Sequence, residues 1–270
     1  MCSNNKAFSI ESDRQMAPQI SRAPGLLLLS LLIVALPARA DTPATIVTWH
    51  DWGPYVGASL PGKGIAGLIV REAFAGTGRD VSIRFRPWNR AYKEASEGMH
   101  LAAFPYAHNE RRARDFRFTD ALFSTSVRLF AARSHVDQDK WVESIDHPSI
   151  CLPQGYNTRI AERLFGPVRI VIKRPRAMVN CMHMLRFARV DLVLVSERVG
   201  EFIINHEPGL TKDDFLILSH RFETPVHIMV SRALPNSQSL VKELNEQIGR
   251  MKANGRIESV LERYDSTGRQ

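Results

Sequence analysis

The sequence contains little that would mark it as an enzyme. It has no G-x-S-x-G elbow, no H-E-x-x-H pair, no Walker phosphate loop and no paired cysteines at metal-binding spacing. Its nine histidines are scattered along the chain. We therefore predict no catalytic residues, no metal site and no cofactor.

Long hydrophobic runs are also scarce. The most apolar run, residues 25–36, has twelve residues without a charge, whereas a membrane span of ~30 Å at ~1.5 Å per residue needs about 20. Arg22 precedes this run, and an A-x-A triplet at residues 38–40 follows it. This arrangement is typical of a secretory signal. We predict a signal peptide over residues 1–40, cleavage after Ala40 and a periplasmic location.

Acidic side chains are fewer than basic ones, which gives a net charge of +8. Nucleic-acid binding requires clustered Lys and Arg with aromatic residues among them. The densest basic cluster, Arg111, Arg112 and Arg114, has acidic residues on both sides. We therefore predict no nucleic-acid partner and interpret the positive field as suited to an anionic group of a small solute.

Cysteine is rare, and only Cys151 and Cys181 follow the predicted signal peptide. In an oxidising compartment such a pair tends to form a disulfide, which we predict here. The alternative is a copper site, because Cys181 is followed by Met182, His183 and Met184, whose ligand atoms suit copper. Adjacent residues of a helix point in different directions, so these four side chains are not expected to converge.

Strand-like and helix-like segments alternate along the rest of the chain. This alternation implies an α/β fold with a mostly parallel sheet. Two such units without a flexible linker suggest two lobes with a ligand cleft between them. The predicted strands are 44–49, 81–88, 101–106, 126–133, 168–174, 190–196 and 225–232, and residues 148–156 are predicted as a strand that leads into a Gly-containing turn. The predicted helices are 65–76, 89–98, 157–165, 179–189 and 239–264, the last broken near Gly255.

Several segments, taken in order, resemble one known family. They are an aromatic-Gly-Pro-Tyr loop, RPWNRA, EGMHLAAFPYAHNERRARDFRFTDALF and ARVDLVLVSE. Together they resemble the periplasmic solute-binding proteins of the amino-acid ABC-importer type (bacterial extracellular solute-binding protein family 3). The resemblance implies a periplasmic-binding-protein-like type II fold with two crossings between lobes. The first lobe would comprise residues 41–131 and 226–270, the second residues 132–225, and we expect a monomer.

Five residues of the first lobe are candidates for ligand binding. Arg112 resembles the family arginine that grips a ligand carboxylate, since a guanidinium is a two-pronged donor that stays charged when desolvated. The alternative is that Arg112 is a surface helix residue. Trp52 and Tyr55 lie where the family stacks an aromatic on the ligand, or they pack beneath their loop. Trp88, at a predicted strand end, is a candidate for the cleft or the core, and Tyr106 is expected to face the cleft.

The second lobe contributes two groups of candidates. Gly155, Tyr156 and Asn157 form a turn into a helix, whose N-terminal N–H groups favour an anion. Asn157 is equally suited to be an ordinary N-cap. Members of the resembled family often carry an Asp for the ligand's α-ammonium group where this chain has Ser196. Glu197 beside it is a possible substitute.

Phe104 and Pro105 stand near positions where the resembled family often has small hydroxyl residues. This wall of the cleft is therefore expected to be more apolar than in typical amino-acid binders. The ligand could then be an amino acid, a modified amino acid, a polyamine-like compound or an organic acid.

The expected function is capture of a small polar or charged solute by lobe closure and its delivery to an ABC importer. Two alternatives stay open at this point. One is an exported enzyme that resembles cyclohexadienyl dehydratases, with Glu197 as general acid. The other is a periplasmic sensor without transport. A fold alone does not separate these functions.

Overall fold

The computed structural model describes residues 44–50, 52–135, 144–166 and 169–267. The predicted signal peptide over residues 1–40 and its cleavage site lie outside the described residues. Within these ranges no helix has both the length and the apolar character needed to cross a membrane.

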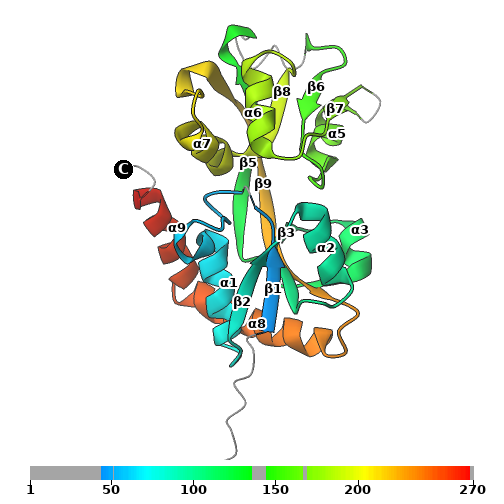
Figure 1. The fold of residues 1–270 in the computed structure, drawn as a ribbon, viewed down its shortest axis with the longest axis vertical. Helices are drawn as coiled ribbons and strands as arrows, with labels where there is room; N and C mark the ends of the chain where they lie inside the picture. Colours follow the sequence, from blue (N-terminus) through cyan, green and yellow to red (C-terminus); the bar gives the residue numbers. More distant parts are fainter. Residues whose placement is uncertain (1–43, 51, 136–143, 167–168, 268–270) are drawn as a thin grey trace, which may run out of the picture. The chain divides into compact units, whose positions relative to one another are not determined.

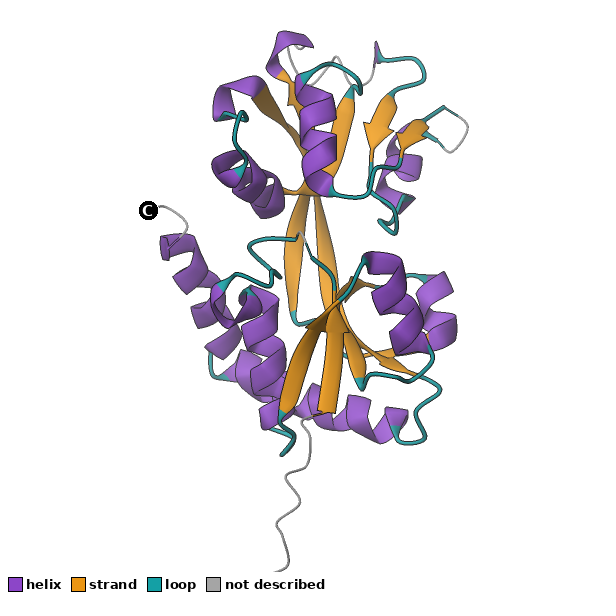
Figure 2. Ribbon diagram, viewed as in Figure 1, coloured by secondary structure: helices purple, strands orange, loops and turns teal. Residues whose placement is uncertain are grey.

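One mixed sheet extends through both lobes in the order β2-β1-β3-β9-β5-β8-β6-β7, with β4 paired to β9. Helices lie around this sheet, as Figure 2 shows. The strands are β1 (Ala44–Thr48), β2 (Val81–Phe85), β3 (Ala102–Ala107), β4 (Phe116–Phe118), β5 (Phe123–Ala132), β6 (Ser149–Cys151), β7 (Val171–Lys173), β8 (Leu192–Ser196) and β9 (Phe215–Ser231).

The first lobe is built on the parallel pairs β1–β2 and β1–β3. Its helix α1 contacts β2, β3, α8 and α9, whereas α2 contacts β1 and β3 (Figure 1). The buried positions of α1 recur three and four residues apart, which is the pattern of a helix face packed on a core. The helices of this lobe are α1 (Ile65–Ala75), α2 (Trp88–Ser96), α3 (Glu110–Asp115), α8 (Ser237–Ala253) and α9 (Arg256–Thr267).

The second lobe repeats this arrangement on a smaller scale. Strand β6 pairs in parallel with β7 and β8, and the helices α5 (Arg159–Phe165), α6 (Met178–Arg186) and α7 (Glu197–His206) surround them. A disulfide joins Cys151 of β6 to Cys181 of α6, with the two Cα atoms 5.4 Å apart. The predicted disulfide is confirmed, and Cys181 is therefore not a thiolate available to copper.

Two long antiparallel strands connect the lobes. Strands β5 and β9 pair from Phe123 opposite Val226 to Ala132 opposite Phe215, and they lie side by side in Figure 1. Past this ladder β9 pairs with β3, and β5 pairs along its other edge with β8. The predicted α/β fold with two lobes and two crossings is confirmed. The predicted lobe boundaries, at residues 131/132 and 225/226, fall inside these two strands and stay predictions.

Helices α3 and α7 and strand β4 were not predicted, and two further elements differ from the sequence-based expectation. Strand β2 ends at Phe85, and Trp88 opens α2, so its prediction as the end of a strand is wrong. Pro87 has a φ of −54° directly before this helix, which suits a helix start. Strand β9 begins at Phe215, well before the predicted residue 225. Its first half contains charged residues, because this part crosses between lobes with one side exposed.

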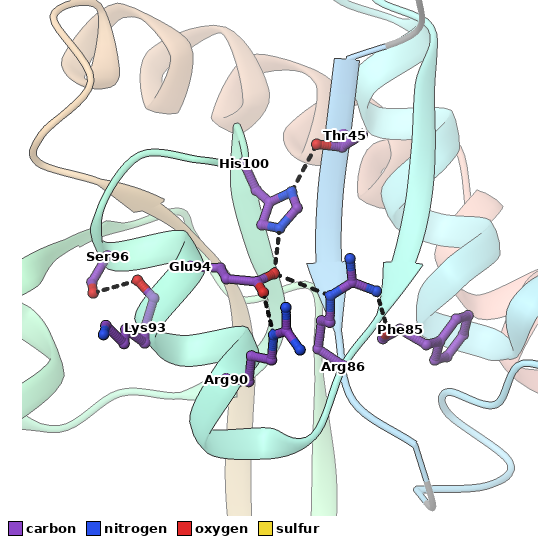
Figure 3. Close-up of polar contacts among 8 residues, drawn as sticks. All are labelled: Thr45, Phe85, Arg86, Arg90, Lys93, Glu94, Ser96 and His100. Carbon is purple, nitrogen blue, oxygen red and sulfur yellow. Dashed lines mark hydrogen bonds and ion pairs between the residues drawn. The ribbon is translucent and has the colours of Figure 1, made fainter.

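A polar network holds α2 against β1 (Figure 3). The Glu94 carboxylate accepts hydrogen bonds from Arg86 Nε at 3.2 Å and Arg90 Nε at 2.6 Å. The His100 ring lies between two partners, with Nε2 at 3.1 Å from Glu94 Oε2 and Nδ1 at 2.7 Å from Thr45 Oγ1. Hydrogen bonds from His100 and Arg90 lower the pKa of Glu94 to about 2. This network fixes the helix whose first residue is Trp88.

Candidate ligand-binding site

A cavity of about 340 Å³ lies between the lobes. The first lobe contributes the ends of β1 and β3 together with the starts of α2 and α3. The second lobe contributes residues of the turn into α5 and the end of β8, and the crossing strands β5 and β9 complete the wall. This volume is within the usual range for sites that hold small molecules.

The predicted ligand residues divide into two groups. The cavity wall includes Trp52, Trp88, Arg112, Tyr156, Asn157 and Ser196. Tyr55, Tyr106, Gly155 and Glu197 lie next to the wall without lining it. Tyr55 is buried beneath its loop, with its ring 4.6 Å from that of Trp52 and 5.3 Å from that of Phe123.

Arg112 is buried and only 6% exposed, so the alternative of a surface helix position is wrong. Its Nη1 donates to the carbonyl of Ala107 at 2.6 Å, and its Nη2 donates to the carbonyl of Gly155 at 3.1 Å. The guanidinium also lies over the rings of Trp88 and Tyr106, at 5.4 and 5.0 Å. Burial lowers the pKa of Arg112, and no ion pair of this side chain occurs within the described ranges.

Trp49 is central to the cavity and was missed by the sequence analysis. Its ring centroid lies 3.9 Å from that of Trp88, 4.9 Å from Tyr106 and 5.9 Å from Trp52. Tyr106 lies behind this aromatic group, where burial raises its pKa. The available signal was the position of Trp49 directly after β1, since ligands of α/β proteins bind at the carboxyl ends of strands.

The turn of Gly155, Tyr156 and Asn157 is held by its own hydrogen bonds. Arg174 Nη1 donates to the carbonyl of Tyr156 at 3.2 Å. The Asn157 side chain accepts from the N–H of Arg159 at 3.1 Å, while Thr158 is the N-cap of α5. The expectation that Asn157 itself is the N-cap is therefore wrong by one residue. The side chain of Asn157 still reaches the cavity wall.

Glu197 is engaged in an ion pair at the start of α7. Arg128 Nη1 lies 3.2 Å from both carboxylate oxygens, and the same guanidinium donates to the carbonyl of Leu218 at 2.7 and 3.1 Å. Ser196, which does line the cavity, has a buried hydroxyl without a hydrogen-bond partner among the described residues. Ser196 therefore contributes an uncharged hydroxyl to the wall.

Pro105 lines the cavity, whereas Phe104 is fully buried in the core. Of the two residues predicted to form an apolar wall, Pro105 lines the cavity and Phe104 does not. Two further cations, Arg159 and Arg163, lie at the exposed edge of the cavity. Neither was predicted from the sequence, because exposed arginines of a short helix look like ordinary solvated surface.

A second hollow of about 470 Å³ lies on the second lobe alone, beside Phe187 and His183. Its histidine is already paired, with Nε2 2.9 Å from Glu207 Oε1. Of the buried side-chain nitrogen and oxygen atoms that lack a hydrogen-bond partner within the described ranges, none belongs to the residues of this hollow. The cavity between the lobes is therefore the candidate site.

No protein-family model matches the sequence, and a comparison with curated proteins gives no match. Solved structures do match. A histidine kinase sensor domain with similarity to periplasmic binding proteins aligns with a TM-score of 0.69 at 18% identity, covering 82% of this chain and 95% of that one. The substrate-binding protein AbpA of an amino acid ABC transporter from Streptococcus pneumoniae, bound to L-arginine, aligns with a TM-score of 0.69 at 14% identity. The alignment covers 84% of this chain and 95% of that one.

An ancestral amino-acid-binding protein, described as a precursor of cyclohexadienyl dehydratase, aligns with a TM-score of 0.68 at 14% identity, covering 82% of this chain and 94% of that one. At such identities the likeness shows the fold. The predicted periplasmic-binding-protein-like type II fold is thereby confirmed, and the neighbours include amino-acid binding proteins of ABC transporters, as the resemblance in sequence implied.

Proposed function

We propose that this chain is an exported, monomeric solute-binding protein that captures a small solute between its lobes and delivers it to an ABC importer. One observation carries the proposal. The cavity between the lobes contains a buried cation, Arg112, that has no acidic partner within the described ranges. A buried charge of this kind is costly unless a counter-charge arrives. A ligand anion supplies that counter-charge.

Capture would proceed by closure of the lobes, a common motion in two-lobed binding proteins. Two contacts across the cavity support this proposal. Arg112 of the first lobe donates to Gly155 of the second, and Arg159 of α5 lies 3.7 Å from Glu110 of α3. Contacts of this type form only when the lobes approach each other, so they favour a closed form once a solute is enclosed.

The enzyme alternative has weaker support. Its candidate acid, Glu197, lies outside the cavity wall and is held by Arg128. Glu223, the acidic residue of the wall, is exposed and its carboxylate pairs with Arg221 Nε at 2.9 Å. A general acid is expected within hydrogen-bond reach of the reacting group, usually with a shielded carboxyl. Binding without turnover fits this arrangement better.

The test is a binding screen on purified protein from which bound ligand has been removed by partial unfolding and dialysis. Amino acids, polyamines and organic acids are added singly, and the midpoint of thermal unfolding is followed. Saturable stabilisation by one class, with a smaller radius of gyration in X-ray scattering, supports capture by closure. Conversion of prephenate or arogenate would replace this proposal with the enzyme. Uptake of the bound compound by cells with and without the gene separates an importer component from a sensor.

A further inference from the structure

We propose that the cavity selects an organic acid with an apolar or aromatic body and discriminates against the α-ammonium group of an amino acid. The carboxylate would bind at Arg112, and the body would lie among the indole rings. This inference rests on the proposed function as a solute-binding protein and specifies the class of its ligand.

The charged residues of the cavity wall are mostly basic. Arg112, Arg159 and Arg163 carry the positive charges, and Glu223 carries the negative one. The Glu223 side chain is 54% exposed and paired with Arg221. Its charge is therefore screened by water and by its partner. Arg159 is likewise exposed and lies 3.7 Å from Glu110, so the positive field that a ligand meets comes chiefly from the buried Arg112.

The nearest candidate for an ammonium partner is already in use. Glu197 follows Ser196 of the wall, but both of its oxygens lie 3.2 Å from Arg128 Nη1. Ser196 offers a hydroxyl in place of a charge. A buried ammonium group needs an anionic partner to offset its desolvation. Within the described ranges, the acidic residue of the wall is Glu223, which is exposed and already paired with Arg221.

Two unpartnered polar atoms of the wall point to an acceptor-rich ligand. Trp49 Nε1 and Ser196 Oγ are buried and make no hydrogen bond within the described ranges. An indole N–H can only donate, so it requires an acceptor. An ammonium group cannot accept a hydrogen bond, whereas a carboxylate accepts several. A carboxylate or another oxygen acceptor that reaches this N–H would satisfy Trp49, whereas an ammonium group would leave it unsatisfied.

Arg112 also has hydrogen-bonding capacity left. Its recorded acceptors are the carbonyls of Ala107 and Gly155, while a guanidinium has five N–H donors. A carboxylate in the cavity can accept from the remaining donors. The pairing would also offset the burial of this cation, whose present acceptors are neutral.

The aromatic residues of the wall supply the surface for the ligand's body. Trp49, Trp52, Trp88 and Tyr156 all line the cavity. Such rings can also attract a cation, which would favour an amine. In this cavity, however, the guanidinium of Arg112 already lies 5.4 Å from the Trp88 ring centroid. The rings of Trp49, Trp52 and Tyr156 remain for apolar contact with the body of the ligand.

The test compares pairs of compounds that differ only in the α-ammonium group. The probes are 3-phenylpropionate with L-phenylalanine, 3-(indol-3-yl)propionate with L-tryptophan, and glutarate with L-glutamate. Calorimetric titration of the ligand-free protein is expected to give a dissociation constant about tenfold or more lower for the acid of at least one pair. Tighter binding of the amino acids would overturn this inference and leave the proposed function standing. Failure of every pair, together with the binding screen, would overturn both.

Three variants make the assignment specific to residues. Ser196→Asp adds a carboxylate to the wall and is expected to weaken binding of the acid at least about tenfold and to improve that of its amino-acid partner. Trp49→Phe keeps an aromatic ring and removes the N–H. It is expected to weaken binding of the organic acid several-fold. Arg112→Gln is expected to abolish acid binding, whereas Arg111→Gln, at the exposed neighbouring position, is expected to retain it. Unchanged preference in Ser196→Asp would contradict the inference.

Discussion

Arg112 donates to the carbonyl oxygen of Gly155 at 3.1 Å and thereby joins the first lobe to the second. Trp88 can also approach this turn closely because Gly155 has no side chain. Gly155 has a φ of +85°, and a Cβ atom built on it would overlap the indole of Trp88. The same residue thus permits a left-handed turn in one lobe and close approach of a ring from the other.

The first prediction concerns this approach. Gly155→Ala is expected to raise the dissociation constant of any ligand that binds between the lobes by more than about tenfold, because the new methyl group meets Trp88 as the lobes close. X-ray scattering should show that the ligand-bound variant is less compact than the wild-type protein. Calorimetric titration measures the loss of affinity.

Gly166→Ala is the matched control for this variant. Gly166 also has a positive φ, of +75°, but a Cβ atom there would meet nothing within 4 Å. Both variants bear the cost of a non-glycine residue at a positive φ, about 1 to 3 kcal/mol. Only Gly155→Ala adds the contact with Trp88. Equal loss of affinity in the two variants would show that backbone strain, and not the approach of the lobes, is responsible.

The second prediction concerns the ion pair of Arg128 and Glu197. Glu197→Gln is expected to lower the free energy of unfolding by about 1 kcal/mol, because the partly buried Arg128 loses its counter-charge. The affinity for ligand should be retained, since Glu197 lies outside the cavity wall. Chemical denaturation and calorimetric titration of the same preparation measure the two effects. If the variant keeps its stability and no longer binds ligand, Glu197 contacts the ligand and this prediction is wrong.

The fold could be predicted from sequence because its signals are local. Alternating strands and helices identify the α/β class, and only two cysteines, Cys151 and Cys181, follow the predicted signal peptide, so one pairing was expected between them. Arg112 was predicted as a ligand contact through its place in a recognisable segment. Its burial, by contrast, depends on Trp88, Tyr106 and Gly155, which reach it from three other segments.

The rest of the site depends on long-range pairing. Glu197 appeared to be available to a ligand because Arg128, 69 residues earlier in the chain, is adjacent only in the folded sheet. Trp49 appeared to be the last residue of a core strand, and nothing in its local sequence shows that its N–H has no acceptor. Strand β9 was predicted too short because its crossing segment is exposed on one side and carries polar residues.

The third prediction concerns the disulfide. Replacing both Cys151 and Cys181 by Ala is expected to lower the free energy of unfolding by about 3 to 4 kcal/mol, on the basis of a closed loop of 30 residues. The midpoint of urea denaturation should fall accordingly, while the wild-type protein treated with reductant should approach the variant. Mass spectrometry of alkylated, unreduced protein should find no label on either residue. Two labelled cysteines would contradict the pairing.

The fourth prediction concerns pH and the Glu94 network (Figure 3). Hydrogen bonds from His100 and Arg90 lower the pKa of Glu94 from an ordinary 4.5 to about 2 in the folded protein. Between these values the unfolded chain binds a proton at Glu94 and the folded chain does not. The stabilisation is therefore complete above about pH 4.5 and is lost as the pH falls toward 2.

Glu94→Gln removes this ionisation while keeping the size of the side chain. The variant is expected to be less stable than the wild-type protein at pH 7, and the difference in free energy of unfolding should shrink as the pH falls from 4.5 toward 2. Urea denaturation of both proteins at a series of pH values measures this difference in free energy of unfolding. Glu97→Gln, at an exposed position on the same helix end, should track the wild-type protein throughout. A difference for Glu94→Gln that stays constant down to pH 2.5 would mean that packing of the side chain, and not its charge, holds α2 against β1.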